Sequence, residues 1–414
     1  MMSARTDNLE RWAVVALAAG VGLIQVTIFG WAPLALAGVL GAIVIRRNGF
    51  GVAMPSFVWA LAALAAWTLV SCAFSSEPMT SFERSRQLLY FLIVPLTIRL
   101  ARGPAAMRIL DTIITIGAIS ALAGVVEYAF MNFRGLGHRP SGFLGLYMTF
   151  SGLTMLVLCA AVARLVYRER EWLWPAVAVP ALLAALIVSE SRNAWVGALA
   201  GIALLLVMRN WKLLIAVPVA IGVLAVLAPT VAKDRAKSIF DLSDPTNRDR
   251  LAMLESGRLM IEAHPLVGVG MNMVPKAYLQ YKTADAVDPP DKPGATRSHL
   301  HNVPVQLAAE RGLPAMAAWL WFIAAALRDL ARLWRRQRSS ALAAAGLAAV
   351  VAMVVAGQFE HNFGDSEFLV LFLALISLPF AAAASASPAS NAPAPVLVGS
   401  GPSRAAGADA RFKA

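Results

Sequence analysis

Long uncharged apolar blocks, separated by short charged segments, fill most of the chain. Residues 12–45 contain no charge, which is too long for one membrane-spanning helix and fits two short ones that turn at Gly30 to Pro33. A span needs roughly 20 apolar residues. Further apolar runs lie at about 55–74, 87–101, 109–131, 141–166, 172–189, 194–208, 211–230, 303–327, 341–357 and 365–382. The pattern predicts about twelve transmembrane helices.

The composition also favours a membrane protein. Hydrophobic residues make up 59% of the 414 residues and charged residues 14%, against about 25% charged in a typical soluble domain. Helices satisfy all their backbone polar groups inside a bilayer, and these apolar runs are continuous. The predicted fold class is therefore an all-α polytopic membrane protein.

Basic residues indicate the orientation of the chain. If every run crosses once and the N-terminus is cytoplasmic, the short cytoplasmic segments hold 17 Lys and Arg, and the short outer turns hold 5. Short cytoplasmic loops of membrane proteins carry such an excess. Both termini are therefore expected in the cytoplasm.

The predicted organisation has four parts. Residues 1–230 hold transmembrane helices 1–9, residues 231–302 form a large outer loop, residues 303–382 hold helices 10–12, and residues 383–414 form a disordered cytoplasmic tail. The outer loop keeps ten Lys and Arg, and long loops cross membranes regardless of charge. Connections of this length are usually functional or disordered.

Charge and cysteine content exclude two classes of function. The net charge of +12 is spread over loop ends instead of forming one basic stripe with aromatic residues, so no nucleic-acid partner is expected. Cys72 and Cys159 lie inside apolar runs, which argues against a disulfide framework or a thiolate zinc site.

The strongest local signal is Arg297-Ser298-His299-Leu300-His301-Asn302, where the outer loop re-enters the membrane. Asn302 can cap the helix that follows, and Pro304 suits its first turn. His301 would then lie at a helix N-terminus, where the dipole favours the neutral imidazole that a general base needs. The alternative is an exposed or capping histidine.

A metal site is a second alternative for this segment. His299 and His301 could face one ion from an extended backbone, but zinc needs at least a third protein ligand. His264, Glu360 and His361 are nearby candidates without ligand spacing in the sequence. No metal or other cofactor is therefore expected.

Arginines gather on the predicted outer side. Arg192 lies in a polar break between two apolar runs, Arg84 and Arg86 lie in an outer turn, and Arg250 and Arg258 lie on the long loop. The guanidinium fork fits phosphate oxygens. The alternatives are anchoring to membrane lipid headgroups, or ion pairs with Glu83, Glu190 or Asp249. These alternatives are favoured for Arg84 and Arg86, and both interpretations stay open for Arg192.

Residues 264–270, with the sequence His-Pro-Leu-Val-Gly-Val-Gly, follow a predicted helical stretch at 251–263. No strand precedes them, and the glycine spacing differs from that of a dinucleotide-binding fingerprint. Glycines allow tight turns and close backbone approach. We therefore expect a structural turn.

Together these motifs resemble those of the O-antigen ligase family, the WaaL-like ligases that share a domain with O-antigen polymerases. The ligase motif is a His followed by Asn, Ser or Gln, then nine residues and Gly-x-x-Gly. It is matched by His301-Asn302 and Gly312-Leu313-Pro314, with Ala315 in place of the last glycine. The family's Arg-rich helix and glycine turn match residues 250–270, and its Ser-Arg break matches Ser191-Arg192. The similarity covers roughly residues 140–320.

The resemblance implies a GT-C-like glycosyltransferase in a bacterial inner membrane, with the 231–302 loop and the active site in the periplasm. Such ligases transfer a glycan from undecaprenyl diphosphate to a sugar hydroxyl of lipid A–core in lipopolysaccharide biosynthesis, without a metal and with inversion. By match of motif, His301 would be the catalytic base, and Arg192 and Arg250 would bind the donor diphosphate. Second-tier positions are His299, Arg258, Arg297, Glu310, Arg84 and Arg86.

Two other functions stay open. An O-antigen polymerase or another lipid-linked glycan transferase would share the arginines and the loop, and would differ in its acceptor. A lipid or glycolipid transporter would need charges in mid-span and broken paired helices, whereas polar residues here gather at the outer ends of the spans.

Overall fold

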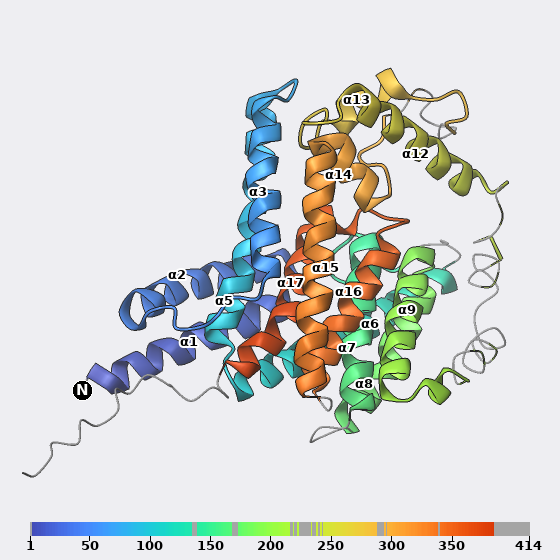
Figure 1. The fold of residues 1–414 in the computed structure, drawn as a ribbon. Helices are drawn as coiled ribbons and strands as arrows, with labels where there is room; N and C mark the ends of the chain where they lie inside the picture. The colour runs from blue at the N-terminus through green and yellow to red at the C-terminus, as the bar shows by residue number, and fades with distance from the viewer. Residues whose placement is uncertain are drawn as a thin grey trace, which may run out of the picture.

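The computed structural model describes residues 2–134, 139–167, 173–215, 243–287, 296–337 and 340–384, with isolated positions at 218, 222, 233, 237, 238, 241 and 294. All regular secondary structure in these residues is helical (Figure 1). The predicted all-α class is confirmed for this part of the chain.

The helices before the long loop are α1 (Met2–Leu23), α2 (Trp31–Asn48), α3 (Phe57–Ala73), α4 (Pro78–Arg84), α5 (Ile93–Leu100), α6 (Pro104–Phe133), α7 (Tyr147–Val166), α8 (Leu173–Val188) and α9 (Arg192–Arg209). Those after it begins are α12 (Pro245–Ala263), α13 (Val274–Tyr281), α14 (Val303–Arg311), α15 (Leu313–Arg336), α16 (Ala341–Ala356) and α17 (Ser366–Ala383). Short 3₁₀ helices are η1 (Ile28–Gly30), η2 (Ser85–Leu92), η3 (Trp211–Ile215) and η4 (Asn362–Gly364).

Several helices match the dimensions of a bilayer. Within the described residues, six segments are long and apolar enough to cross it: Ile28–Asn48, Pro104–Phe133, Tyr147–Val166, Arg192–Arg209, Leu313–Arg336 and Ser366–Ala383. Helices α3, α8 and α16 are apolar but shorter. The chain is thus a helical membrane protein, and the count of twelve spans stays a prediction. The predicted span at 211–230 and the predicted tail at 383–414 lie mostly outside the described residues.

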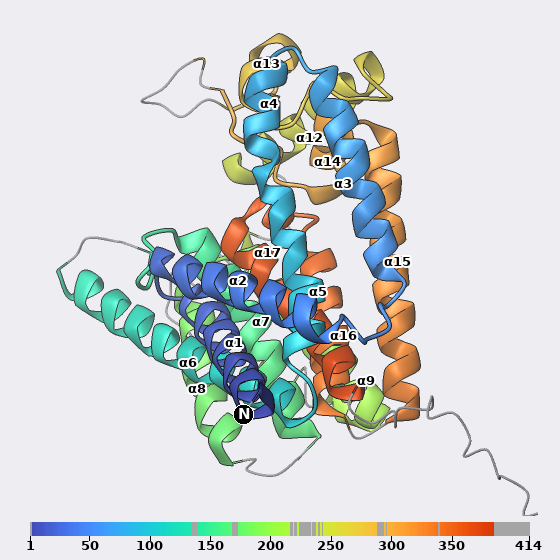
Figure 2. The same ribbon diagram turned by 90° about the vertical axis from the view of Figure 1, so that its left-hand side faces the viewer.

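The interior of the bundle is formed by α7, α16 and α17, whose side chains are mostly buried. Helices α12, α13 and α14 lie together at one end of the bundle, beside the ends of α3 and α15 (Figures 1 and 2). The start of α1 and the end of α17 lie toward the opposite end. This arrangement agrees with an outer loop and two cytoplasmic termini, although the sidedness of the membrane stays a prediction.

Two details predicted from the sequence are wrong. The run at 303–327 is not one helix, because α14 ends at Arg311 and α15 begins at Leu313. Gly312 (φ +82°) interrupts it, and a Cβ on this residue would lie 1.8 Å from the carbonyl oxygen of Leu266. Arg84 and Arg86 do not lie in a turn either. They belong to α4 and η2, which lead directly into α5 as one helical run.

Residues 264–270, the glycine turn, pack against the C-terminal end of α14. The backbone amides of Val269 and Gly270 donate to the carbonyl oxygens of Ala309 and Glu310, each at 2.9 Å. Both glycines of the turn have positive φ, and α14 backbone atoms occupy the space that a Cβ at the first of them would need. The structural role expected for this turn is confirmed.

Candidate active site

His301 lies just before α14, on a backbone that is fixed from several sides. The side chain of Asn302 accepts from the amide of Val305 (2.9 Å), and Pro304 lies in the first turn of α14, as predicted. The amide of Val303 donates to the carbonyl oxygen of Gly357 (2.7 Å) at the end of α16. His301 itself has φ +52°, a conformation uncommon for residues other than glycine. Such conformations persist where the surroundings fix them, often at functional sites.

Glu360, between α16 and α17, joins the two histidines of this segment. Its Oε2 lies 2.8 Å from Nδ1 of His301, and its Oε1 lies 3.6 Å from Nδ1 of His299. Burial raises the pKa of the Glu360 carboxyl, but the hydrogen bond from His301 and the charges of both histidines lower it to about 2. An ionised carboxylate only accepts hydrogen bonds, so Nδ1 of His301 carries the hydrogen. In the neutral ring, Nε2 then keeps the free lone pair.

The two neighbouring histidines favour the neutral form. Burial lowers the pKa of His299, and the charges of His301 and Arg250 add to this against the opposing charge of Glu360. Burial, with the charge of His299, lowers the pKa of His361 to about 3. Both rings are therefore neutral near pH 7.

The same residues include a possible metal-ligand set. One ligand atom from each of His299, His301 and Glu360 lies within 4.8 Å of the others. Sequence spacing gave no sign of this third ligand, because Glu360 is far from the histidines along the chain. The contact forms only when the turn between α16 and α17 packs against the residues that precede α14.

Two cavities that share arginine side chains lie near the start of α9, and His301 lines the first of them. The first, of about 190 Å³, is lined by Arg192, Arg250 and His301. The second, of about 210 Å³, shares both arginines with the first and adds Arg139. We call them together the arginine cavities. The fold thus brings the three residues predicted for catalysis and donor binding to one place, from the start of α9, from α12 and from the residues before α14.

The arginines of these cavities are held differently. Nη1 of Arg192 donates to the carbonyl (2.9 Å) and hydroxyl (2.8 Å) oxygens of Ser238, and Nη2 lies 3.8 Å from Oδ1 of Asp244. Arg139 lies 3.7 Å from Glu190. Arg250 is partly buried and, within the part of the chain that the structure describes, has no hydrogen-bond or ion-pair partner. It is therefore the arginine best placed to bind an anionic ligand.

Other predicted arginines form ion pairs instead. Arg297 binds Asp249 through two nitrogens (3.0 and 3.2 Å), which ties the segment before His299 to α12. Arg258 is exposed and pairs with two glutamates of its own helix. Arg86 pairs with Glu83 at 2.7 Å. The ion-pair alternative therefore describes Arg86 and Arg258, and Arg297 is held by an ion pair as well.

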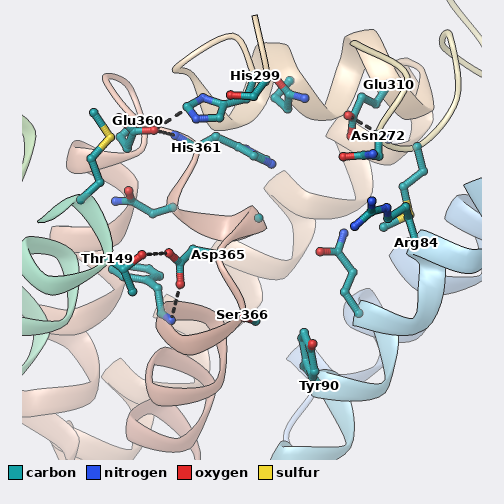
Figure 3. Close-up of a pocket in the computed structure, with 18 of the residues that line it drawn as sticks. Arg84, Tyr90, Thr149, Asn272, His299, Glu310, Glu360, His361, Asp365 and Ser366 are labelled. Atoms are coloured by element: carbon teal, nitrogen blue, oxygen red, sulfur yellow. Dashed lines mark hydrogen bonds and ion pairs between the residues drawn. The ribbon is translucent and has the colours of Figure 1, made fainter. Parts of the chain in front are cut away.

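A larger polar cavity, of about 750 Å³, lies on the other side of Glu360. His299, Glu360 and His361 line one side of it, and Arg84 and Tyr90 line the opposite side (Figure 3). We call it the polar cavity. Glu360 thus lines the polar cavity and His301 lines the first arginine cavity, so their contact lies between the two.

Two buried charged side chains from the end of α14 also face the polar cavity. Oε1 of Glu310 accepts from the amide of Asn272 (2.9 Å), and burial raises the pKa of its carboxyl. The side chain of Arg311 is 4% exposed and lies 3.9 Å from Glu310. Its Nε has no hydrogen-bond partner among the described residues. A buried donor of this kind is costly to leave unpaired, so an anionic ligand oxygen in the cavity would stabilise it.

Two residues of the site were not assigned to it from the sequence: Glu360, which was considered only as a possible metal ligand, and Arg139. Each had a weak signal: Glu360 with His361 forms a polar break between two apolar runs, and Arg139 lies in a short segment before α7. Neither signal could show that the residue meets His301 or Arg250, because both contacts join distant parts of the chain.

Residues 177–320 match the family model described as O-antigen ligase. The matched segment contains Arg192, Arg250 and His301, whereas Arg139 and Glu360 lie outside it. The match supports an O-antigen ligase-like family for this chain. No curated protein matches the chain.

Proposed function

We propose that this O-antigen ligase-like membrane protein is a glycosyltransferase that moves a glycan from undecaprenyl diphosphate to a sugar hydroxyl of lipid A–core. One observation carries the proposal: His301, hydrogen-bonded to a buried carboxylate, lines a cavity together with Arg192 and Arg250. In this proposal the chain crosses a bacterial inner membrane about twelve times in a GT-C-like arrangement. Both termini are cytoplasmic, and the site faces the periplasm.

His301 is the proposed general base. The acceptor hydroxyl oxygen attacks the anomeric carbon of the donor sugar, and its proton passes to Nε2 of His301. Glu360 holds Nδ1–H at 2.8 Å, so it fixes the tautomer that leaves Nε2 free and stabilises the imidazolium that forms. A base positioned in this way contributes typically 10²–10⁴-fold to the rate.

Arg250 and Arg192 are the proposed donor clamp. As the bond between the anomeric carbon and the diphosphate oxygen breaks, the electron pair leaves with the diphosphate and its negative charge grows. Fixed guanidinium groups stabilise this charge without a metal ion. Arg250 has no competing partner in the described part of the chain, and Arg192 is fixed by Ser238. Arg139 adds a third guanidinium group to the lining of the arginine cavities.

The polar cavity is the proposed acceptor site. Its volume of about 750 Å³ lies within the usual range of about 300–1,000 Å³ for ligand sites. Its lining of hydroxyl, amide and charged side chains suits a sugar, and the guanidinium groups of Arg84 and Arg311 suit the phosphate or carboxylate groups of a core oligosaccharide. The acceptor would therefore meet the donor at the wall formed by His301 and Glu360.

Reconstitution tests this proposal directly. The purified chain is incubated with undecaprenyl-diphosphate glycan and lipid A–core, with and without a chelator, and products are separated by gel electrophoresis. We expect transfer that persists in chelator and is lost in His301→Ala and Arg250→Ala. Retained transfer in a folded His301→Ala variant would remove the proposed base. Lengthening of the donor glycan without attachment to lipid A–core would identify a polymerase instead.

A further inference from the structure

His299, His301 and Glu360 have the ligand types and spacing of a transition-metal site. In tetrahedral zinc sites the metal–ligand distances of about 2.0–2.2 Å place ligand atoms roughly 3.3 Å apart. Here Nδ1 of His301 lies 2.8 Å from Oε2 of Glu360, and Nδ1 of His299 lies 3.6 Å from Oε1 of the same carboxylate, so both rings face one carboxylate at close range. All three ligand atoms lie within 4.8 Å of one another.

We propose that these three residues bind one Zn²⁺, with the fourth coordination position open to water, and that the bound ion inhibits the enzyme. Two histidines and one carboxylate with an open position are a common zinc donor set. The inhibitory part of this inference rests on the proposed function, whereas the binding part does not.

The cluster is accessible to an ion. The side chains of His299 and His301 are 27% and 20% exposed, and His299 and Glu360 line the polar cavity. His361 lies next to the cluster, with its ring centroid 6.2 Å from that of His299. It is not one of the three ligands, but its Nδ1 is buried without a hydrogen-bond partner in the described residues, and so can orient a metal-bound water.

The charges around the cluster limit how tightly the ion binds. Glu360 supplies the single carboxylate of the ligand set, and the nearby guanidinium of Arg250 repels a cation. The affinity is therefore expected to suit reversible inhibition and release by a chelator.

Inhibition follows from the two nitrogens of His301. When Zn²⁺ binds, the Nδ1 lone pair forms the metal bond, the Nδ1 proton leaves to solvent, and Nε2 takes up one proton. The ring stays neutral, but Nε2 no longer has the lone pair that accepts the proton of the acceptor hydroxyl. Glu360 at the same time exchanges its hydrogen bond from His301 for a bond to the metal.

Metal titration tests the site without any glycan substrate. The purified full-length chain is titrated with Zn²⁺ by calorimetry and with Co²⁺ by visible absorption, which reports the ligand geometry. We expect one ion per chain, with binding weakened roughly tenfold or more in His299→Ala and in Glu360→Gln. His264→Ala is the matched control, because His264 contacts Tyr281 outside the cluster, and it should bind as the parent does. Thermal unfolding checks each variant, and His299→Asn replaces His299→Ala if the alanine variant does not fold.

The outcomes separate the two parts of the inference. No binding by the parent chain, or binding that the His299 variant leaves unchanged, overturns the site. In the transfer assay, Zn²⁺ should stop product formation and a chelator should restore it. Full transfer at a Zn²⁺ concentration that saturates the Co²⁺-detected site overturns the inhibitory role. If no transfer is seen even without metal, the proposed function has failed, and the titration still decides the site.

Discussion

Nδ1 of His301 lies 2.8 Å from Oε2 of Glu360, and this contact joins the start of α14 to the turn between α16 and α17. Glu360 is 8% exposed and its carboxyl is ionised, since its pKa is lowered to about 2. The carboxylate therefore fixes which nitrogen of His301 carries the hydrogen. In the proposed reaction Glu360 is a positioning residue that acts through His301.

Glu360→Gln should lower kcat for glycan transfer and leave the KM for the donor little changed. The amide NH₂ of glutamine can donate to Nδ1, which moves the ring hydrogen to Nε2 and removes the proton acceptor. The loss can reach the roughly 10²–10⁴-fold that a positioned base contributes. Steady-state kinetics with a variable donor concentration measure it.

Glu360→Asp is the conservative control for this prediction. Aspartate keeps the carboxylate but is shorter, so it should recover part of the lost kcat. An unchanged kcat in a Glu360→Gln variant with normal thermal unfolding would contradict the positioning role.

Arg250→Ala should weaken donor use far more than Arg258→Ala, although both residues lie on α12. Arg250 lines the arginine cavities, whereas Arg258 pairs on the surface with glutamates of its own helix. Hydrogen bonds to charged groups contribute about 1.5–3 kcal/mol each, so kcat/KM for the donor should fall roughly 10- to 100-fold per bond lost. Arg258→Ala should leave kcat/KM close to that of the parent.

Arg250→Lys refines the same comparison. Lysine keeps the charge but lacks the planar fork, so it should recover only part of the activity. Equal losses in Arg250→Ala and Arg258→Ala would mean that the arginine cavities do not bind the donor.

Gly312→Ala should destabilise the protein more than Gly49→Ala, although both glycines have positive φ. An alanine Cβ at position 312 would lie 1.8 Å from the carbonyl oxygen of Leu266, whereas nothing lies within 4 Å of a Cβ at Gly49. Both glycines combine positive φ with ψ near 170° (168° at Gly49 and 169° at Gly312), a conformation that costs other residues about 1–3 kcal/mol. The clash adds about 1–3 kcal/mol at position 312 only. Thermal unfolding in detergent compares them, and similar midpoints would show that the glycine turn can move away from α14.

The sequence predicted the parts of this protein that depend on local patterns. Apolar runs gave α3, α8, α9, α16 and α17 close to their observed bounds, because each run is set off by charged or turn residues. Asn302 and Pro304 predicted the start of α14, because a capping side chain and a first-turn proline are local signals. The break at Gly312 could not be read in this way, since it depends on the backbone of residues 264–270 packing against α14.

In the candidate site, too, local motifs identified some residues, whereas contacts between distant parts of the chain could not be predicted. His301, Arg192 and Arg250 could be named because they lie in short motifs, and the structure gathers them around one cavity. Glu360 could not be assigned to His301, because their contact depends on how α16 and α17 pack in three dimensions. Arg297 was only a second-tier position by match of motif, and the fold alone shows that Asp249 is its partner.

Asp365→Asn should stabilise the protein at neutral pH. Asp365 caps α17 by accepting from the amide of Phe368 (2.9 Å) and also accepts from the hydroxyl of Thr149. Burial raises the pKa of its carboxyl above the ordinary value of about 4. A raised folded-state pKa means that the folded chain holds the proton more tightly than the unfolded chain. The contribution of this group to stability is therefore full below about pH 4 and is lost as pH rises through the folded-state pKa.

Asparagine caps helices as well as aspartate does and cannot ionise. The unfolding midpoint of Asp365→Asn should therefore exceed that of the parent near pH 7, and the difference should shrink as the pH falls toward 4. Asp365→Ala separates the cap from the charge, because it loses the cap, at a cost of about 1 kcal/mol. It should thus be less stable than Asp365→Asn at every pH. If Asp365→Asn were instead less stable than the parent at neutral pH, the ionised carboxylate would be stabilising α17, and burial would not be the dominant influence on this group.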